Sequence, residues 1–117
     1  MKTDNLIQQK SYAFAVRIVR MCQFLVETKR EFVLSKQVLR SGTGIGANVE
    51  EAIGGQSRAE FLSKMSIAYK EARETCYWLR LLKDTDYLTE VEFNSIHAEC
   101  DELCRIISKI QTTTKRN

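Results

Sequence analysis

The chain has 117 residues, of which 44% are hydrophobic and 28% are charged, and it contains no proline. This composition is typical of one folded domain rather than a disordered segment, and the lack of proline favours long, uninterrupted helices. No hydrophobic run approaches the ~20 residues that span a membrane, and MKTDNLIQQK lacks a signal-peptide core. We therefore expect a single domain over residues 1–117, in a cytoplasmic protein with no membrane partner.

Hydrophobic residues recur in alternating steps of three and four in four segments of the chain. This spacing is typical of helices that pack along a seam, and it predicts helices over residues 4–28, 31–53, 58–84 and 90–112. The connections are short, so consecutive helices should be antiparallel neighbours. The predicted fold class is all-α, an antiparallel up-down-up-down four-helix bundle.

Capping signals mark the predicted helix starts. SRAE at residues 57–60 and TEVE at residues 89–92 fit the capping box, in which a hydroxyl and a carboxylate satisfy free backbone amides. TKRE at residues 28–31 is expected to start the second helix in the same way. GGQ at residues 54–56 is expected to end that helix in a tight turn.

Three glycines at alternate positions in SGTGIGANVEE, residues 41–51, resemble those of a phosphate-binding loop. Such a loop needs a preceding strand or a Gly-Lys-Ser/Thr ending, and neither is present. We therefore interpret the segment as helix. Because glycine costs ~1 kcal/mol there relative to alanine, we expect Gly42 and Gly46 to allow close approach of another helix and Gly44 to face a second neighbour. A local kink is the alternative.

The same segment carries a family resemblance. LRSGTGIGANVEEA, residues 39–52, resembles the central motif of the 23S rRNA intervening-sequence proteins, although Gly44 stands where that family often has serine. SRAEFLSKMSIAYKEARETCYWLRLL, residues 57–82, resembles the family's second block. The matching polar and aromatic positions include Arg40, Asn48, Glu51, Glu71, Glu74 and Trp78.

The resemblance spans about residues 10–110 and implies a four-helix bundle that assembles as a homopentamer. It also implies a relationship to the accessory proteins of diversity-generating retroelements, which bind nucleic acid and a reverse transcriptase. It carries over no established enzymatic activity and no cofactor.

Hydrophobic residues outside the seams indicate self-association. On the first and third predicted helices these residues are Tyr12, Val19, Phe24, Val26, Ile67, Trp78 and Leu81. In a small monomer they would leave large exposed patches, so we expect a homo-oligomer. The alternative is that they turn inward, because straight helices drift by ~20° per heptad from a seven-residue repeat.

The motif residues Arg40, Asn48 and Glu51 point away from the seam of the second predicted helix. We expect them to form a polar contact between subunits, with Glu71 or Glu74 as the partner. The alternative is that Arg40 is exposed and meets an anionic partner.

Positive charge is concentrated in residues 1–48, where eight Lys and Arg face three Asp and Glu; the remainder has ten against twelve. Phosphate contacts by these cations would bind structured RNA in a salt-dependent way, whereas the alternative is ordinary solvated helix faces. We find no alternation of basic and aromatic residues of the kind that stacks single-stranded bases. The candidate nucleic-acid-binding residues are Lys10, Arg17, Arg20, Lys29, Arg30, Lys36 and Arg40, with Lys115 and Arg116 in the tail.

His97, Cys100 and Cys104 share one side of the fourth predicted helix, which is compatible with metal ligands. Because spaced Cys-x-x-Cys pairs are missing, we interpret the cysteines as reduced packing residues and expect no metal and no cofactor. No motif ties His97, the single histidine, to a nucleophile or a carboxylate, so no catalytic residue is predicted. The expected function is non-enzymatic binding of structured RNA, or of an RNA–protein complex, by an oligomer. The alternative is a scaffold or adaptor for a protein partner that binds no nucleic acid.

Overall fold

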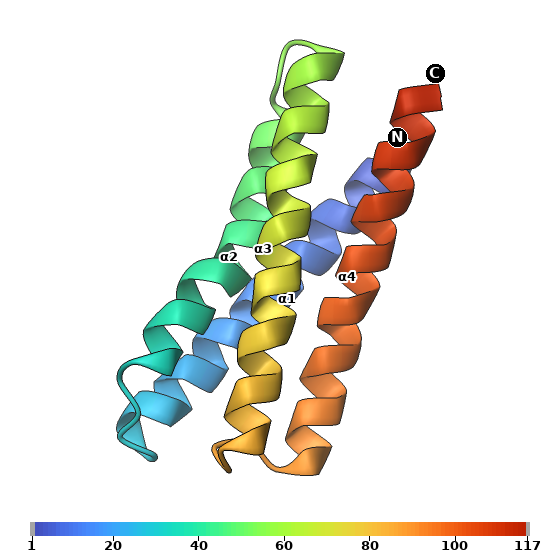
Figure 1. Cartoon of the computed structure of the whole chain (residues 1–117). Helices are drawn as coiled ribbons and strands as arrows, with labels where there is room; N and C mark the ends of the chain where they lie inside the picture. Colours follow the sequence, from blue (N-terminus) through green and yellow to red (C-terminus); the bar gives the residue numbers. More distant parts are fainter. Residues whose placement is uncertain (1, 117) are drawn as a thin grey trace.

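A computed structural model describes the backbone of residues 2–116 and the side chains of residues 5–116. The chain folds into four helices, α1 (Lys2–Glu27), α2 (Leu34–Ile53), α3 (Arg58–Asp84) and α4 (Glu90–Arg116). Consecutive helices run antiparallel, and α1 passes behind α3 and α4, so that its first turns lie near the end of α4 (Figure 1). The bundle measures 46 × 21 × 19 Å. The predicted all-α four-helix bundle is confirmed.

The core of the bundle is built from the predicted seams. Phe14 and Ile18 of α1, Ile45 of α2, Leu79 of α3 and Ile107 of α4 are all completely buried. Burying such a side chain contributes about 1.5–3 kcal/mol, so these stripes dominate the stability of the fold. Among the described residues, every buried polar side-chain atom has a hydrogen-bond partner.

The capping boxes of α3 and α4 form as predicted. The Glu60 amide donates to Ser57 Oγ over 3.1 Å, and the Glu60 carboxylate accepts from the Gln56 amide over 2.7 Å. At α4, the Thr89 amide donates to Glu92 over 2.9 Å, and the Glu92 amide donates to Thr89 Oγ1 over 3.1 Å. These side chains satisfy amides that a helix start leaves without partners.

The predicted start of the second helix at residue 31 is wrong, because α2 begins at Leu34. Residues 28–33 form the turn out of α1, and Arg30 adopts a left-handed backbone with φ of 55°. Glu31 still caps α2, but it lies before the first residue of the helix and uses its side-chain carboxylate. Its carboxylate accepts hydrogen bonds from the amides of Val33, Leu34 and Ser35 over 3.2, 3.0 and 2.7 Å.

The three glycines of residues 41–46 lie inside an uninterrupted α2, so the phosphate loop is excluded. A Cβ added to Gly42 would lie 2.8 Å from Ile18 of α1, and one added to Gly46 would lie 3.4 Å from the Ser11 carbonyl. A Cβ on Gly44 would lie 2.9 Å from Glu71 of α3. The predicted close approach of two neighbours is therefore confirmed. α2 ends as predicted at Gly54, whose amide donates to the Glu50 carbonyl over 3.0 Å.

No helix within residues 2–116 combines the length and the apolar character that crossing a membrane requires.

Candidate nucleic-acid interface

Three of the predicted nucleic-acid-binding cations, Lys10, Arg17 and Arg40, form ion pairs within the chain. Lys10 Nζ lies 3.1 Å from the Glu102 carboxylate, and Arg17 pairs with Glu99, so both cations of α1 reach acids on α4. Arg17 also donates to Ser95 Oγ over 3.2 Å. The side chains of the Lys10–Glu102 and Arg17–Glu99 pairs are about 40% exposed, so each of these two pairs contributes at most about 1 kcal/mol.

Four other predicted cations, Arg20, Lys29, Arg30 and Lys36, lie toward the end of the bundle where α1 turns into α2, whereas Lys115 and Arg116 lie in the last turn of α4. Lys29 sits over the Phe24 ring at 5.9 Å and Arg30 over the Phe32 ring at 5.0 Å. Lys36 is exposed on α2, and Arg20 lines a groove between α1 and α4. The structure therefore gathers only some of the predicted residues at one end and places Lys10 and Arg17 along a different helix pair.

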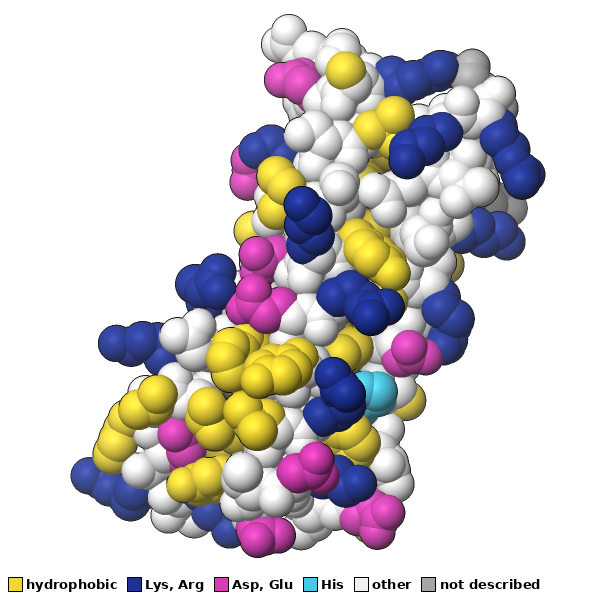
Figure 2. Space-filling model, in the orientation of Figure 1, with side chains coloured by type: hydrophobic (Ala, Val, Ile, Leu, Met, Phe, Trp, Pro, Cys, Tyr) yellow, Lys and Arg dark blue, Asp and Glu magenta, His cyan; other side chains and the backbone are white. Residues whose placement is uncertain are grey.

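A second group of cations, which the sequence analysis missed, runs along the outer face of α3. Lys70, Arg73, Tyr77 and Arg80 follow one another in steps of three, four and three, and all four are exposed. We call these residues the α3 strip. Lysines and arginines are spaced down the front of the molecule, over α3 and α4, in Figure 2. Among the described residues, no ion pair involves a cation of the α3 strip.

Tyr77 places an aromatic ring between the cations of the α3 strip. It is 49% exposed, and its ring packs edge-on against Trp78 with 5.0 Å between ring centroids. Hydrogen bonding with Tyr69 raises the pKa of the Arg73 guanidinium. The sequence analysis did not single out this combination of cations and an aromatic ring on one helix face. Helical spacing at Arg73, Tyr77 and Arg80 was the signal available in the sequence.

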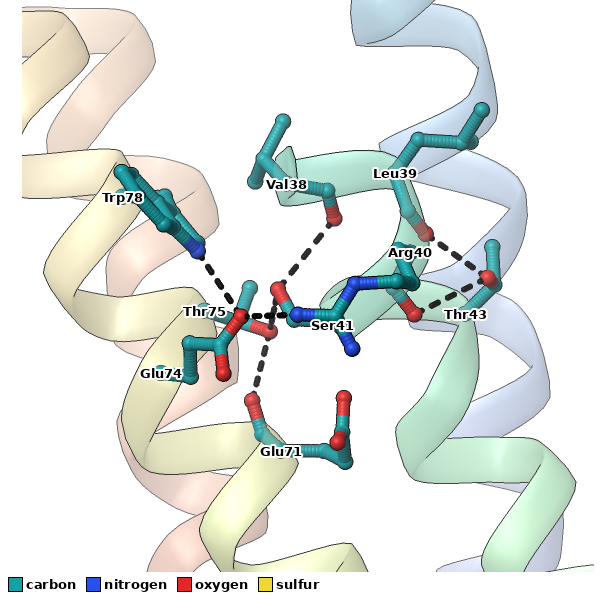
Figure 3. A network of polar contacts seen from close by, with 9 residues as sticks. All are labelled: Val38, Leu39, Arg40, Ser41, Thr43, Glu71, Glu74, Thr75 and Trp78. Carbon is teal, nitrogen blue, oxygen red and sulfur yellow. Dashed lines mark hydrogen bonds and ion pairs between the residues drawn. The ribbon is translucent and has the colours of Figure 1, made fainter. Parts of the chain in front are cut away.

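A polar network joins α2 to α3 at the family motif (Figure 3). Glu74 Oε2 accepts from Arg40 over 2.8 Å and from the Trp78 indole over 3.0 Å. Beneath it, the buried hydroxyls of Ser41 and Thr75 hydrogen-bond each other at 2.9 Å. The predicted partnership of Arg40 with Glu74 thus forms inside one chain; a role for these residues between subunits stays a prediction.

Glu71 lies beside this network without an ion pair in the described part of the chain. Burial raises the pKa of its carboxyl, the nearby Glu74 raises it further, and Arg40 opposes both. Its carboxylate occupies the space that a side chain at Gly44 would fill. The close approach of this acid therefore depends on glycine at position 44.

The remaining motif residues lie apart from the network. The Asn48 amide donates to the Gly44 carbonyl over 2.8 Å, one turn back on the same helix. Glu51 pairs with Lys64 Nζ over 3.0 Å. Of the predicted motif set, the structure brings together Arg40, Glu71, Glu74 and Trp78.

The hydrophobic residues outside the seams are exposed to different degrees. On α1, Tyr12 is 70% exposed, Val16 43% and Val19 37%. We call these three residues the α1 outer strip. Shallow grooves flank the strip, one toward α4 with a volume of about 340 Å³ and one toward α2 of about 240 Å³. The inward-turning alternative does not hold for Tyr12.

The other predicted outer positions vary between exposed and half-buried. Phe24 and Ile67 are exposed, whereas Val26, Trp78 and Leu81 are half-buried.

His97 stacks on Phe93, with 4.7 Å between ring centroids. Cys100 and Cys104 of α4 are buried, and Cys76 Sγ of α3 lies 2.9 Å from Cys100 Sγ, a contact that the sequence analysis did not anticipate. No group of histidine, cysteine, aspartate or glutamate among the described residues has an arrangement suited to a metal ion.

These features define a class of protein: a small all-α bundle whose α2 and α3 are joined by an arginine–glutamate–tryptophan network. The chain belongs to the 23S rRNA-intervening sequence protein family, whose model matches residues 3–109. A crystal structure of a protein with unknown function from the S23 ribosomal protein family of Bacteroides thetaiotaomicron is similar throughout. It has a TM-score of 0.93 and 50% sequence identity, and the match covers 94% of this chain and 98% of that one.

A search of curated proteins found no match. Neither the family description nor that of the similar structure names an enzymatic activity. The relationship to retroelement accessory proteins stays a prediction.

Proposed function

We propose that this protein is a non-enzymatic, oligomeric four-helix bundle that binds structured RNA through the α3 strip. The observation that carries the proposal is the exposed run of Lys70, Arg73, Tyr77 and Arg80 on one helix face, with no ion pair to these cations among the described residues. At ~1.5 Å per residue the strip extends over roughly 15 Å. Its cations contact phosphates, and the tyrosine stacks on an unpaired base of a loop or bulge.

Self-association strengthens this binding, because each subunit adds a copy of the strip to the same RNA-facing surface. The α1 outer strip supplies the apolar surface for that association, since an exposed apolar patch on a small protein marks an interaction site. The subunit number of five comes from the family resemblance alone.

To test the proposal, the wild-type protein and two matched variants are each titrated into a labelled RNA hairpin that has an unpaired loop. The strip variant is Arg73→Ala/Tyr77→Ala/Arg80→Ala. The control is Lys29→Ala/Arg30→Ala/Phe32→Ala, which also removes two cations and one exposed aromatic ring but lies at the α1–α2 turn. Helicity by circular dichroism and mass in solution are verified for both.

We expect the strip variant to bind at least about tenfold more weakly, because loss of one stacked ring alone costs about 1–3 kcal/mol. The control should stay within about threefold of the wild type, since its cations make no contact in this account. Equal losses of affinity in both variants, or a loss in the control alone, would contradict the α3 strip as the contact surface. Either result would favour the residues at the α1–α2 turn that the sequence analysis predicts.

A second candidate function is a scaffold for a protein partner without nucleic-acid binding. The exposed α1 outer strip and its flanking grooves favour it, because such apolar surface suits a partner helix. A wild-type protein that binds no RNA at low salt would favour this function instead.

A further inference from the structure

Two cysteine sulfurs from different helices touch at the α3–α4 contact. Cys76 of α3 donates its thiol hydrogen to Cys100 Sγ of α4, with 2.9 Å between the two sulfurs. A disulfide bond is about 2 Å long, so the sulfurs need to approach by only about 1 Å to form one. The Cys100 thiol in turn donates to the Ala72 carbonyl over 3.3 Å. That carbonyl lies inside α3 and keeps its helical hydrogen bond when Cys100 loses its proton.

Unequal exposure gives the two sulfurs different access to a reagent in solution. Cys76 is half-buried, whereas Cys100 is completely buried. An external reagent therefore reaches Cys76 first, and Cys100 is placed to react with Cys76. Cys22 provides an internal contrast: it is buried, and its thiol donates to the Ser35 carbonyl over 3.4 Å. Among the described residues, the one hydrogen bond between two sulfurs is that of Cys76 with Cys100.

The approach to Cys76 is flanked by positive charge. Arg73 lies three residues before it and Arg80 four residues after it, at spacings that share one helix face, and both are exposed. Asp101 of α4 is also near the sulfur, but this acid is paired with Arg105. No ion pair within the described chain occupies Arg73 or Arg80. Such a surface attracts small molecules that carry carboxylates.

We propose that Cys76 and Cys100 form a thiol–disulfide exchange site, in which Cys76 reacts with an anionic low-molecular-weight disulfide and Cys100 closes a reversible cross-link between α3 and α4. The contact between the two sulfurs and the exposure of one of them carry this inference, which does not depend on RNA binding. Cys22 and Cys104 remain the small packing residues that the sequence analysis expects.

The chemistry balances in two steps. The Cys76 thiol gives its proton to water, and its sulfur attacks one sulfur of the small disulfide. The S–S bond of the small disulfide breaks, a mixed disulfide forms at Cys76, and the departing thiolate takes up a proton. The Cys100 sulfur then loses its proton and attacks the Cys76 sulfur, which releases the second small thiol. Two protein thiols and one small disulfide give one protein disulfide and two small thiols, and an excess of a dithiol reverses the reaction.

The surroundings of Cys76 set the conditions for the test. The hydrogen bond with Cys100 lowers the pKa of Cys76, whereas burial and the nearby Cys104 and Asp101 raise it to about 12. The thiolate is the form that attacks a disulfide, so exchange is slow at neutral pH. The reaction is therefore followed at pH 8.5, where a larger fraction of the thiol is ionised.

The experiment treats the reduced full-length protein with glutathione disulfide, blocks the remaining thiols by alkylation and maps the products by mass spectrometry. Cleavage after glutamate separates Cys76 from Cys100, because Glu90 lies between them. It also separates Cys100 from Cys104, because Glu102 lies between those two. We expect two of the four free thiols to disappear, with a Cys76–Cys100 cross-link inside one chain.

Four cysteine variants, each verified as folded by circular dichroism, locate the reaction. Cys22→Ala and Cys104→Ala should form the cross-link within about twofold of the wild-type rate. Cys76→Ala should lose the cross-link and leave Cys100 unmodified, whereas Cys100→Ala should stop at the mixed disulfide on Cys76. A product joining other cysteines, a cross-link between two chains, or no cross-link in the wild-type protein would overturn the proposal.

Two further readouts test the charge and the fit of the cross-link. Arg73→Ala/Arg80→Ala should slow exchange with glutathione disulfide at least about threefold more than exchange with the neutral hydroxyethyl disulfide, because only the anion is attracted. Equal slowing with both reagents would refute the preference for an anionic disulfide. The oxidised wild-type protein should unfold at a temperature roughly 5–15 °C higher than the reduced protein, because the cross-link constrains the unfolded chain. Unfolding at the same or a lower temperature would contradict a cross-link that fits the native helices.

Discussion

Glu31 shows how one side chain sets the boundary between two helices. It is 8% exposed, and its carboxylate accepts hydrogen bonds from three consecutive backbone amides. Burial raises the pKa of this carboxyl, but the hydrogen bonds from Leu34, Ser35 and Val33 outweigh it and leave the pKa below its ordinary value of 4.5. A carboxyl with a lowered pKa in the folded state stabilises the fold above its unfolded-state pKa, and that contribution is lost as the pH falls through the folded-state pKa.

Glu31→Gln should therefore lower the free energy of unfolding by about 1–2 kcal/mol at pH 7, as loss of a helix cap does. Below about pH 4 the difference should shrink, because the wild-type carboxyl then also loses its charge. Urea unfolding followed by circular dichroism at both pH values measures this. Glu27→Gln, at an exposed position near the end of α1, is the control. A difference from wild type that is as large at pH 3 as at pH 7 would refute the charged cap.

The glycines of α2 make a prediction at the level of the helix. Gly42→Ala should lower the free energy of unfolding by about 1–3 kcal/mol, because its Cβ would fall 2.8 Å from both branches of the buried Ile18 side chain. Gly46→Ala should be neutral or stabilising by up to about 1 kcal/mol, since its Cβ finds ordinary contact distances and alanine favours helix.

The free energy of unfolding of Gly44→Ala should lie between those of Gly42→Ala and Gly46→Ala. Its added Cβ meets only the end of the flexible Glu71 side chain, which can rotate toward solvent. Thermal unfolding of the three variants under one condition ranks their stabilities. If Gly42→Ala were as stable as Gly46→Ala, the close approach of α1 to α2 would be refuted.

The helices themselves could be predicted well from the sequence, because burial on one face of a helix leaves a local pattern in the chain. The span of α3 agrees with the prediction at both ends, and the capping boxes of α3 and α4 involve residues only three or four apart. The start of α2 could not be predicted in this way. There the Glu31 carboxylate accepts a hydrogen bond from the Ser35 amide, and the preceding turn has a left-handed backbone at Arg30. No short motif encodes that geometry.

At the scale of the whole molecule, the α1 outer strip predicts the state of assembly. Tyr12→Glu/Val19→Glu should reduce the mass of the particle in solution, because two charges would be buried in the proposed contact. Sedimentation velocity measures this, and Val91→Glu, at a position 80% exposed on α4, is the control. A wild-type protein that sediments as a monomer would contradict the proposed assembly.

The candidate site was less predictable than the fold, because it depends on contacts between residues far apart in the sequence. Net charge predicted that the nucleic-acid-binding residues lie in the first half of the chain. Arg17 and Lys10 are, however, paired with Glu99 and Glu102, more than 80 positions away. Cys76 likewise contacts Cys100, 24 positions later. Charge balance counts cations but does not reveal which of them acids already neutralise.

The salt dependence of RNA binding tests the central claim most directly. The affinity of the wild-type oligomer for a structured RNA is measured over a series of salt concentrations, beside Arg73→Ala/Arg80→Ala of verified mass. Each phosphate contact contributes about −0.7 to −0.9 to the slope of log K against log salt. We predict a steep negative slope that becomes shallower by about 1.4–1.8 for each bound subunit in the variant. No binding at low salt, or the same slope in both proteins, would contradict the account.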